Sequence, residues 1–243
     1  MDQPVLVYAI TAVAVTVPCF YLALVFLSPP PIVTRPSEKK YRSRSSPNTP
    51  KPLPSLADKG SVDLTVVIPA YNETARLPSM LSTTLAHLST PALKKSRTYE
   101  ILIVDDGSAD ETSALGVKLA GEYPESDIRV VTLEKNLGKG GAVRHGMLYA
   151  RGQRLLMVDA DGASRFEDLE LLWEAMDKLA PKNEPAVVVG SRAHLVKTEA
   201  VVKRSFIRNI LMYGLHTILR IVGVGHIRDT QCGFKLFTRR AAQ

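Results

Sequence analysis

Short apolar runs alternate with longer amphipathic stretches from residue 64 to residue 189. Five runs rich in β-branched residues predict strands at residues 64–69, 99–104, 129–133, 153–158 and 186–189. The stretches between them predict helices at residues 75–88, 112–122, 141–151 and 166–179. This alternation is typical of an α/β fold with a largely parallel sheet. Because ligands of such sheets bind beyond the carboxyl ends of the strands, the loops that follow these strands are the candidate functional positions.

Upstream of this region the chain is far more apolar. Residues 4–27 carry no charged side chain, and a helix of that length would cross a hydrocarbon core of about 30 Å. A cleaved signal peptide is the alternative, but the run exceeds the usual ~7–15 residues and lacks a basic segment before it and a small-residue cleavage site. The pattern therefore predicts a retained transmembrane anchor. Basic residues follow the span, so the positive-inside rule predicts a single-pass protein whose large C-terminal part faces the cytosol.

Residues 28–62 are rich in Pro, Ser, Lys and Arg and show no apolar periodicity. This composition predicts an extended, solvated linker. Its basic stretch at residues 39–44 could also rest on anionic lipid headgroups. The globular domain is predicted to cover residues 63–243.

The net charge of +7 and the pI of about 9.4 would suit nucleic acid, anionic lipid or phosphate-bearing substrates. The sequence contains no recognisable DNA- or RNA-binding module, so no nucleic-acid partner is predicted. The two cysteines, Cys19 and Cys232, are far apart, and one lies within the apolar segment. A disulfide framework is therefore implausible, and the lack of a C-x-x-C pattern leaves zinc unsupported.

Polar residues follow the first two predicted strands. Asp105 and Asp106 come directly after the second strand, where they could hold a ribose hydroxyl, a base N–H or a metal, or form a helix entry capped by Ser108 or Asp110. After the first strand, Glu73 could serve a ligand or simply favour the start of a helix. These residues alone leave both interpretations open.

The pattern Asp159-Ala160-Asp161-Gly162 follows the fourth predicted strand. The two carboxylates alternate across an extended strand end and therefore share one face. Two hard oxygen ligands on one face suit Mg²⁺ or Mn²⁺, with diphosphate oxygens and water as the other ligands. A structural turn is the alternative; an EF-hand is excluded because its other spaced ligands are missing.

A glycine-rich loop, Asn136-Leu137-Gly138-Lys139-Gly140-Gly141, leads into a predicted helix. Its glycines allow a ligand to approach the backbone closely, and Lys139 offers a cation for phosphate. The loop matches neither the P-loop pattern nor the dinucleotide fingerprint, which should follow the first strand. The second mismatch disfavours an anchored oxidoreductase.

Basic residues are frequent in the last third of the chain. Arg192 follows the fifth predicted strand, and Lys203, Arg204 and Arg208 lie on an amphipathic stretch. A cationic ring facing the same loops could hold phosphates, although any single Arg is more often a surface residue. Residues 207–224 either lie in a membrane interface, where they would admit a lipid acceptor, or form an ordinary core helix.

Taken together, VVIPAYNE, VDDGS, NLGKGGAVRHG, DADG, GSR and DTQCGFKLF occur in the order found in family-2 glycosyltransferases. The chain resembles in particular the dolichyl-phosphate β-glucosyltransferases of the endoplasmic reticulum membrane. The resemblance covers residues 63–240 and implies a GT-A fold. It places five residues around the uridine: Pro69, Tyr71, Glu73, Asp105 and Asp106.

The resemblance also assigns the remaining roles. Asp159 and Asp161 would match the metal-binding DxD motif, with Mg²⁺ or Mn²⁺ as the cofactor. Arg192 and Lys235 would match basic positions near the diphosphate and the acceptor phosphate, and Arg204 is a further candidate there. Relatives of this type continue well beyond the GFKLF segment, so the C-terminal part of the domain is expected to be missing.

The implied activity is inverting transfer of glucose from UDP-glucose to dolichyl phosphate, which serves protein N-glycosylation. Mannosyl transfer from GDP-mannose is the alternative within the enzyme class, because both reactions use Asp pairs and a lipid acceptor. A catalytically incompetent short form that binds a nucleotide sugar is the alternative outside it.

Overall fold

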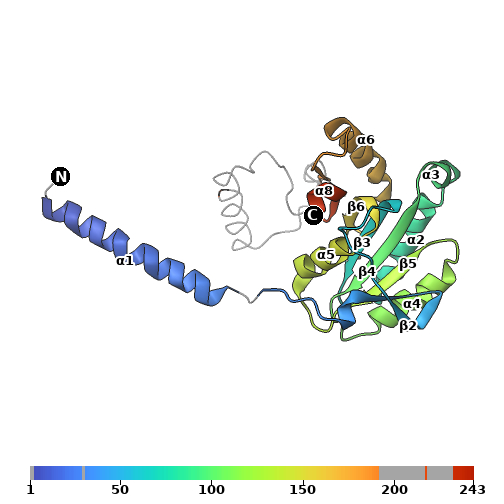
Figure 1. The fold of residues 1–243 in the computed structure, drawn as a ribbon, viewed down its shortest axis with the longest axis horizontal. Coiled ribbons are helices and arrows are strands. Elements are labelled where there is room, and N and C mark those ends of the chain that lie inside the picture. Colours follow the sequence, from blue (N-terminus) through green and yellow to red (C-terminus); the bar gives the residue numbers. More distant parts are fainter. Residues whose placement is uncertain (1–2, 29–30, 192–216, 218–231) are drawn as a thin grey trace, which may run out of the picture. The chain divides into compact units, whose positions relative to one another are not determined.

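The structure is a computed structural model of the 243-residue chain and describes residues 3–28, 31–191, 217 and 232–243. The chain divides into two compact units, residues 1–33 and 34–243. The first unit contains one helix, α1 (Gln3–Leu27), and the second contains a sheet with helices on both faces (Figure 1).

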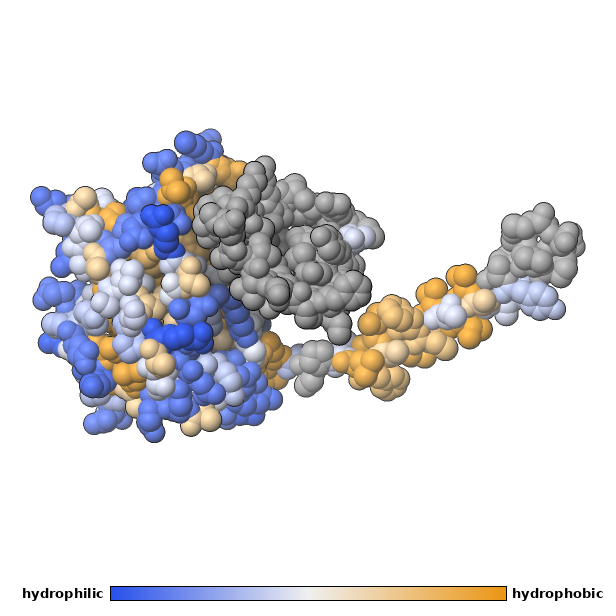
Figure 2. All heavy atoms as spheres, turned by 180° about the vertical axis from the view of Figure 1, so that it is seen from behind, coloured by the Kyte–Doolittle hydropathy of each residue, from blue (hydrophilic) through white to orange (hydrophobic). Residues whose placement is uncertain are grey.

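Apolar side chains cover the described part of α1, as the orange colouring in Figure 2 shows. Phe26 and Leu27, for example, are 84% and 82% exposed within this unit. Among the residues that the structure describes, no helix combines the length and the apolarity needed to span a bilayer. The predicted transmembrane anchor is therefore not confirmed.

The second unit is built on an eight-stranded sheet with the order β2-β1-β5-β4-β3-β6-β8-β7. Its central strands β5, β4, β3 and β6 are parallel, whereas β1, β2, β7 and β8 join antiparallel at the two sides. The strands are β1 (Lys40–Ser43), β2 (Ser46–Pro52), β3 (Val62–Ala70), β4 (Tyr99–Asp105), β5 (Ile128–Thr132), β6 (Gly152–Val158), β7 (Val187–Val189) and β8 (Phe234–Thr238).

Helices cover both faces of this sheet. The helical elements are η1 (Ser37–Lys39), α2 (Leu77–Leu88), α3 (Pro91–Ser96), α4 (Thr112–Glu122), α5 (Gly138–Leu148), η2 (Phe166–Asp168), α6 (Leu169–Leu179) and α8 (Arg239–Ala242). Alternate strand residues divide between two cores: Val66 and Ile103 pack with α2, α4 and α6, whereas Val67 and Leu102 pack with α5. Since both faces are buried, the central strands are mostly apolar and carry no strict alternation of polar residues.

The five predicted strands are confirmed as β3 to β7, and the largely parallel α/β sheet is confirmed at its centre. The predicted helices correspond to α2, α4, α5 and η2 with α6. Two boundaries differ. Helix α2 begins at Leu77, because Pro78 fits only the first turn of a helix. Helix α5 begins at Gly138, so the glycine-rich loop forms its first turn.

Residues 28–62 differ from the predicted extended linker, because they contain η1, β1 and β2. Strand β1 pairs with the edge of β5, where Arg42 lies opposite Val130. Strand β2 then forms the outer edge, with most of its residues exposed. An edge strand buries little of its surface, so most of its residues can be polar. The sequence therefore shows no apolar periodicity that would predict these two strands.

The segment before β1 is fastened to the globular unit by Glu38, whose side chain is 2% exposed. Its carboxylate accepts hydrogen bonds from the backbone N–H groups of Arg35 (2.7 Å) and Glu134 (3.1 Å). Its carbonyl oxygen lies 2.8 Å from Nε2 of His145 on α5. Burial lowers the pKa of His145, so a neutral imidazole donates this hydrogen bond at physiological pH. The globular unit therefore begins at residue 34 rather than at residue 63.

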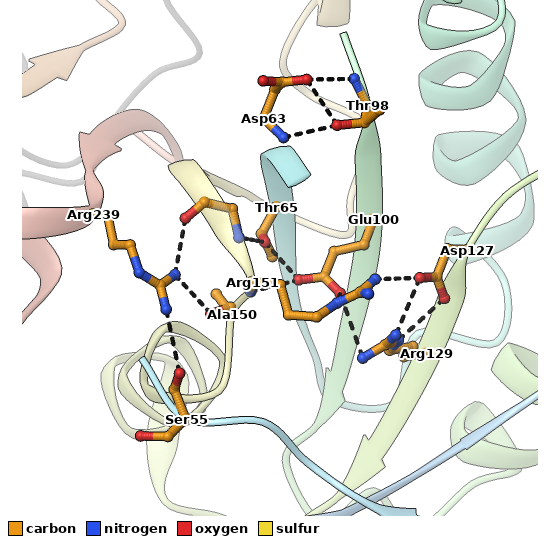
Figure 3. A network of polar contacts seen from close by, with 11 residues as sticks. Ser55, Asp63, Thr65, Thr98, Glu100, Asp127, Arg129, Ala150, Arg151 and Arg239 are labelled. Carbon is orange, nitrogen blue, oxygen red and sulfur yellow. Dashed lines mark hydrogen bonds and ion pairs between the residues drawn. The ribbon is translucent and has the colours of Figure 1, made fainter. Parts of the chain in front are cut away.

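A buried ion-pair network lies at the amino ends of the central strands (Figure 3). Glu100 on β4 is 1% exposed and accepts from the hydroxyl of Thr65 at 2.6 Å. Arg151 contacts the same carboxylate through its backbone N–H and its Nε, each at 2.7 Å. Arg151 and Arg129 also pair with Asp127. This network neutralises the buried carboxylate of Glu100. It lies at the opposite end of the strands from the loops predicted to be functional.

Arg239 at the start of α8 is a second buried cation, 6% exposed. Its guanidinium donates to the carbonyl oxygens of Ala150 and Gly152, each at 2.9 Å, and to those of Ser55 (3.2 Å) and Asp58 (2.7 Å). These bonds join segments from both ends of the unit (Figure 3). Four carbonyl dipoles replace the water that the guanidinium loses on burial.

Candidate functional site

A cavity of about 330 Å³ opens at the carboxyl ends of β3, β4 and β6. It lies in the loops where the sequence places its polar motifs, which agrees with the usual position of ligands in parallel sheets. The cavity is lined by Pro69, Ala70, Tyr71, Glu73, Arg76, Asp106, Asn136, Gly138, Lys139, Ala142, Asp159, Ala160 and Asp161.

The loops after β3 and β4 hold each other in place. Asn72, whose φ of 54° is left-handed, donates its N–H to the hydroxyl of Ser108 (2.9 Å) and accepts from the N–H of Ala109 (2.9 Å). Thr74 donates its hydroxyl to Asp110 at 2.9 Å. Ser108 and Asp110 therefore fix the neighbouring loop, which leaves Tyr71 and Glu73 to line the cavity.

The two adjacent carboxylates after β4 have separate positions. Asp106 lines the cavity and accepts from the N–H of Leu137 at 2.7 Å. Burial raises the pKa of Asp106, the N–H groups of Leu137 and Gly138 oppose this shift, and the charge of Asp105 adds to it. Asp105 does not line the cavity; its carboxylate accepts from the N–H of Ser108 at 3.0 Å. Asp106 is thus the carboxylate placed to meet a ligand, and Asp105 supports the turn.

The amino end of α5 forms another wall of the cavity. Gly107, with φ of +66°, lets the loop before α5 approach closely, since a Cβ there would lie 2.7 Å from the carbonyl carbon of Lys135. A Cβ at Gly140, by contrast, would meet no heavy atom within 4 Å. Packing therefore does not require glycine at position 140, and a ligand could approach the backbone there. A helix amino end with exposed N–H groups suits an anion such as a phosphate.

Asp159 directly follows β6 and faces Lys139 of α5. The ammonium Nζ of Lys139 lies 2.7 Å from Oδ1 and 2.8 Å from Oδ2 of the carboxylate. Oδ1 is buried and receives no well-directed hydrogen bond from the residues described, so Lys139 neutralises it as an ion pair rather than through a directed bond. The backbone N–H of Asp159 donates to the carbonyl of Gly233 at 3.2 Å, which ties the carboxylate to the chain just before β8.

Asp161 is exposed and lines the same cavity. Its Oδ1 accepts from the N–H of Ala163 at 2.9 Å, and Gly162 between them has φ of +70°. Asp161 also borders an adjoining cavity of about 260 Å³ between α2 and the loop after β6. This carboxylate therefore stands where the two cavities meet.

The described residues that line the main cavity carry more negative than positive charge, which favours binding of a cation. Among the lining residues that the structure describes, four carboxylates (Glu73, Asp106, Asp159 and Asp161) face two cations (Arg76 and Lys139), so these residues carry a net formal charge of −2. An anionic ligand such as a diphosphate would be repelled unless a further positive charge joined it. In the described part of the chain, no group of three or more His, Cys, Asp or Glu side chains is arranged to hold a metal. Asp159 and Asp161 nevertheless fit Mg²⁺ or Mn²⁺, which typically take one or two protein carboxylates and complete their shell with phosphate and water oxygens.

Two residues of the site, Arg76 and Gly233, were not predicted from the sequence. Arg76 forms a bidentate ion pair with Glu73, with nitrogen–oxygen distances of 2.7 and 2.6 Å. The spacing of three residues at a helix entry was the available signal for this pair. Gly233 packs against Asp159 from far along the chain, and no local pattern could reveal that contact.

The predicted basic residues of the C-terminal third are only partly described. Arg192, Arg204 and residues 207–224, apart from residue 217, lie outside the described residues. Lys235 lies on β8 opposite Met157, and it does not line the main cavity. The roles of these residues near a diphosphate or an acceptor phosphate remain predictions.

Replacing Gly233 by Ala should weaken binding of a divalent cation by about tenfold, because a displaced carboxylate loses about 1.4 kcal/mol of ligand interaction. The added Cβ would lie 1.9 Å from Oδ2 of Asp159, so the carboxylate must move. Titration with Mn²⁺ measures the effect. Gly121→Ala on α4 is the control, since its Cβ would meet nothing within 4 Å. Equal affinity in the two variants would contradict the assigned contact.

Comparison with known proteins identifies relatives of the whole globular unit. Residues 65–243 match the sequence profile of Glycosyl transferase family 2. The chain is 45% identical over 214 residues to the dolichyl-phosphate beta-glucosyltransferase of Homo sapiens, covering 87% of this chain and 65% of the relative. It is 49% identical over 196 residues to the enzyme of that name from Dictyostelium discoideum, covering 79% of this chain and 60% of the relative. The chain thus spans less than two thirds of the length of either relative.

A solved structure is also similar at a lower level. Glucosyl-3-phosphoglycerate synthase from Mycobacterium tuberculosis, in complex with Mn²⁺, UDP-glucose and phosphoglyceric acid, superposes with a TM-score of 0.49 at 18% identity. The superposition covers 74% of this chain and 57% of that one.

Proposed function

The chain belongs to glycosyl transferase family 2 and has an α/β, GT-A-like fold with a mostly parallel sheet, and on this premise we propose that it transfers glucose from UDP-glucose to dolichyl phosphate. The observation that carries the proposal is one cavity in which Asp106, the amino end of α5, Asp159 and Asp161 meet. The choice of glucose and of a dolichyl phosphate acceptor is supported by the relatives of that activity.

The uridine end of the donor is assigned to the loops after β3 and β4. Tyr71 is 46% exposed beside the cavity, so its ring is available to pack on a base. While it is ionised, the carboxylate of Asp106 can accept hydrogen bonds but not donate them, which suits a donating ribose hydroxyl or the N–H of uracil. Pro69 and Glu73 complete this end of the cavity.

The diphosphate is assigned to the other end, between α5 and the loop after β6. The N–H groups of the first turn of α5 and the ammonium of Lys139 provide positive charge there. Asp159 and Asp161 would hold Mg²⁺ or Mn²⁺, which supplies the charge that neutralises the departing nucleoside diphosphate. The net formal charge of −2 on the described lining residues supports the need for such a cation.

The acceptor simplifies the chemistry of transfer. Its phosphate oxygen is anionic at neutral pH, so no side chain must remove a proton from it. A lone pair of that oxygen forms the new bond to the anomeric carbon, while the bond from that carbon to the UDP oxygen breaks and its electron pair leaves with UDP. A single in-line displacement inverts α-glucose to the β-linked product. The protein's contribution is to orient the reactants and to stabilise charge.

A paired donor assay tests the proposal. Membranes that contain the full chain receive dolichyl phosphate and either labelled UDP-glucose or labelled GDP-mannose, with Mn²⁺ present, and the labelled lipid product is extracted. We expect glucose to be transferred and mannose not. Mannose transfer would instead support the GDP-mannose reaction. Binding of UDP-glucose without any product would support a nucleotide-sugar-binding protein, and both results contradict the proposal.

We further propose that α1 anchors the chain in the endoplasmic reticulum membrane with the catalytic unit in the cytosol. The absence of charged residues over positions 4–27 and the basic residues that follow support this placement. Carbonate extraction and protease treatment of intact microsomes provide the test. Release by carbonate, or protection of the globular unit from protease, would contradict the proposal.

A further inference from the structure

The ion pair between Lys139 and Asp159 occupies a carboxylate that the proposed metal also requires. The ammonium contacts both carboxylate oxygens, at 2.7 and 2.8 Å, so it holds the position between them that a bidentate cation would take. Lysine and metal therefore compete for Asp159.

We propose that Lys139 is an exchangeable counter-ion: it neutralises Asp159 until the donor binds, and then moves to the diphosphate and releases Asp159 to the divalent cation. The inference deepens the proposed function and rests on it for the identity of the donor. When donor and metal bind together, the carboxylate of Asp159 exchanges one cation for another, so its buried oxygen faces a cation both before and after binding.

The surroundings of Lys139 permit this movement. Its side chain is 50% exposed, whereas that of Asp159 is 26% exposed, so the lysine is the freer partner. The neighbouring residues Gly138 and Gly140 have no heavy atom within 4 Å of where a Cβ would lie. The long stem of lysine carries a single charge on rotatable bonds, so it can transfer between two anions without a backbone change.

The exchange predicts that metal and nucleotide strengthen each other's binding. Mn²⁺ alone must displace Lys139 from Asp159, and UDP alone draws Lys139 away and leaves Asp159 uncompensated. When both bind, each anion obtains a cation. Because coupling between two ligands is reciprocal, UDP should raise the affinity for Mn²⁺ by the same factor by which Mn²⁺ raises the affinity for UDP.

Binding of Mn²⁺, followed by loss of the electron paramagnetic resonance signal of the free ion, tests the exchange on the full chain in detergent. Lys139→Met keeps the length of the side chain and removes its charge. We expect this variant to bind Mn²⁺ alone about fivefold more tightly than the wild type, because the competing cation at this half-exposed site is gone. With Mn²⁺ present, it should bind UDP about tenfold more weakly, because a charge-assisted contact to the diphosphate is lost.

Lys135→Met is the matched control. Lys135 lies just before α5, is exposed and does not line the cavity. Its substitution therefore changes the net charge equally without altering a residue that contacts Asp159. Thermal unfolding of both variants shows whether the fold is retained. We expect the control to bind Mn²⁺ and UDP as the wild type does.

The proposal requires that, without UDP, Lys139→Met has a higher affinity for Mn²⁺ than the wild type and than Lys135→Met. It is overturned if the affinity of Lys139→Met does not exceed both. It is also overturned if the UDP-induced gain in Mn²⁺ affinity is the same in Lys139→Met as in the wild type. Failure of the wild type to bind UDP with Mn²⁺ would instead reject the proposed donor, and the measurement with Mn²⁺ alone would still decide whether Lys139 competes for Asp159.

Discussion

Replacing Asp161 by Asn should reduce metal-dependent sugar transfer by at least about 100-fold, because a Lewis-acid cation contributes several kcal/mol and each ~1.4 kcal/mol is a factor of ten. Asp161 is exposed in the cavity, and its Oδ1 accepts from the N–H of Ala163 at 2.9 Å. The amide oxygen of Asn accepts the same bond, so the loop should keep its shape. What the variant loses is the negative charge that the cation requires.

A substitution at Asp161 is easier to interpret than one at Asp159. Asn at position 159 would also break the ion pair with Lys139, so its effect would combine two causes. The measurement is transfer from labelled UDP-glucose in membranes over a range of Mn²⁺ concentrations, with thermal unfolding as the check on the fold. Glu167→Gln, an exposed carboxylate on η2, is the control and should keep wild-type activity. Full activity of Asp161→Asn with added Mn²⁺ would contradict the assignment.

Replacing Glu100 by Ala should lower the free energy of unfolding of the globular unit by about 3–5 kcal/mol, the usual effect of removing one partner from a buried ion pair. Glu100 is 1% exposed and receives the hydroxyl of Thr65 and two N–H groups of Arg151 (Figure 3). Its loss leaves the guanidinium of Arg151 with only Asp127 in this network and creates a cavity between strands.

Denaturant unfolding followed by tryptophan fluorescence measures this change. Trp173 on α6 is the only tryptophan of the chain, and its ring packs with the guanidinium carbons of Arg97 (3.9 Å) and Arg154 (4.1 Å). Glu122→Ala removes an exposed carboxylate that lies 3.9 Å from Lys118 on α4. That control should change stability by less than about 1 kcal/mol, as exposed pairs do. A similar small change in Glu100→Ala would show that the network does not stabilise the fold.

The sequence determined the centre of the sheet and the position of the site. The apolar runs that became β3, β4 and β6 are buried on both faces, and burial of this kind demands an apolar residue at nearly every position. Parallel strands bring their carboxyl ends to one edge, so Asp106, Asp159 and Asp161 could be placed together from their positions directly after the strands.

The tertiary structure alone decided the edges of the sheet and the contacts between distant segments. Strand β1 is recruited by β5, with Arg42 opposite Val130, and an edge pairing of polar residues leaves no local pattern. The division of roles between Asp105 and Asp106 depends on the direction of the chain as it leaves β4, which two adjacent identical residues cannot reveal.

Two contacts of Asp159 also join segments that are distant in the sequence, so the sequence alone could not predict them. Lys139 reaches Asp159 from a different element, and Gly233 meets the same carboxylate only because β8 returns beside β6. Local sequence fixes which residues form a strand or a helix, because periodicity and turn chemistry act over a few neighbours. Which side chains then meet depends on how the elements pack, and the exchange proposed for Lys139 follows from that packing.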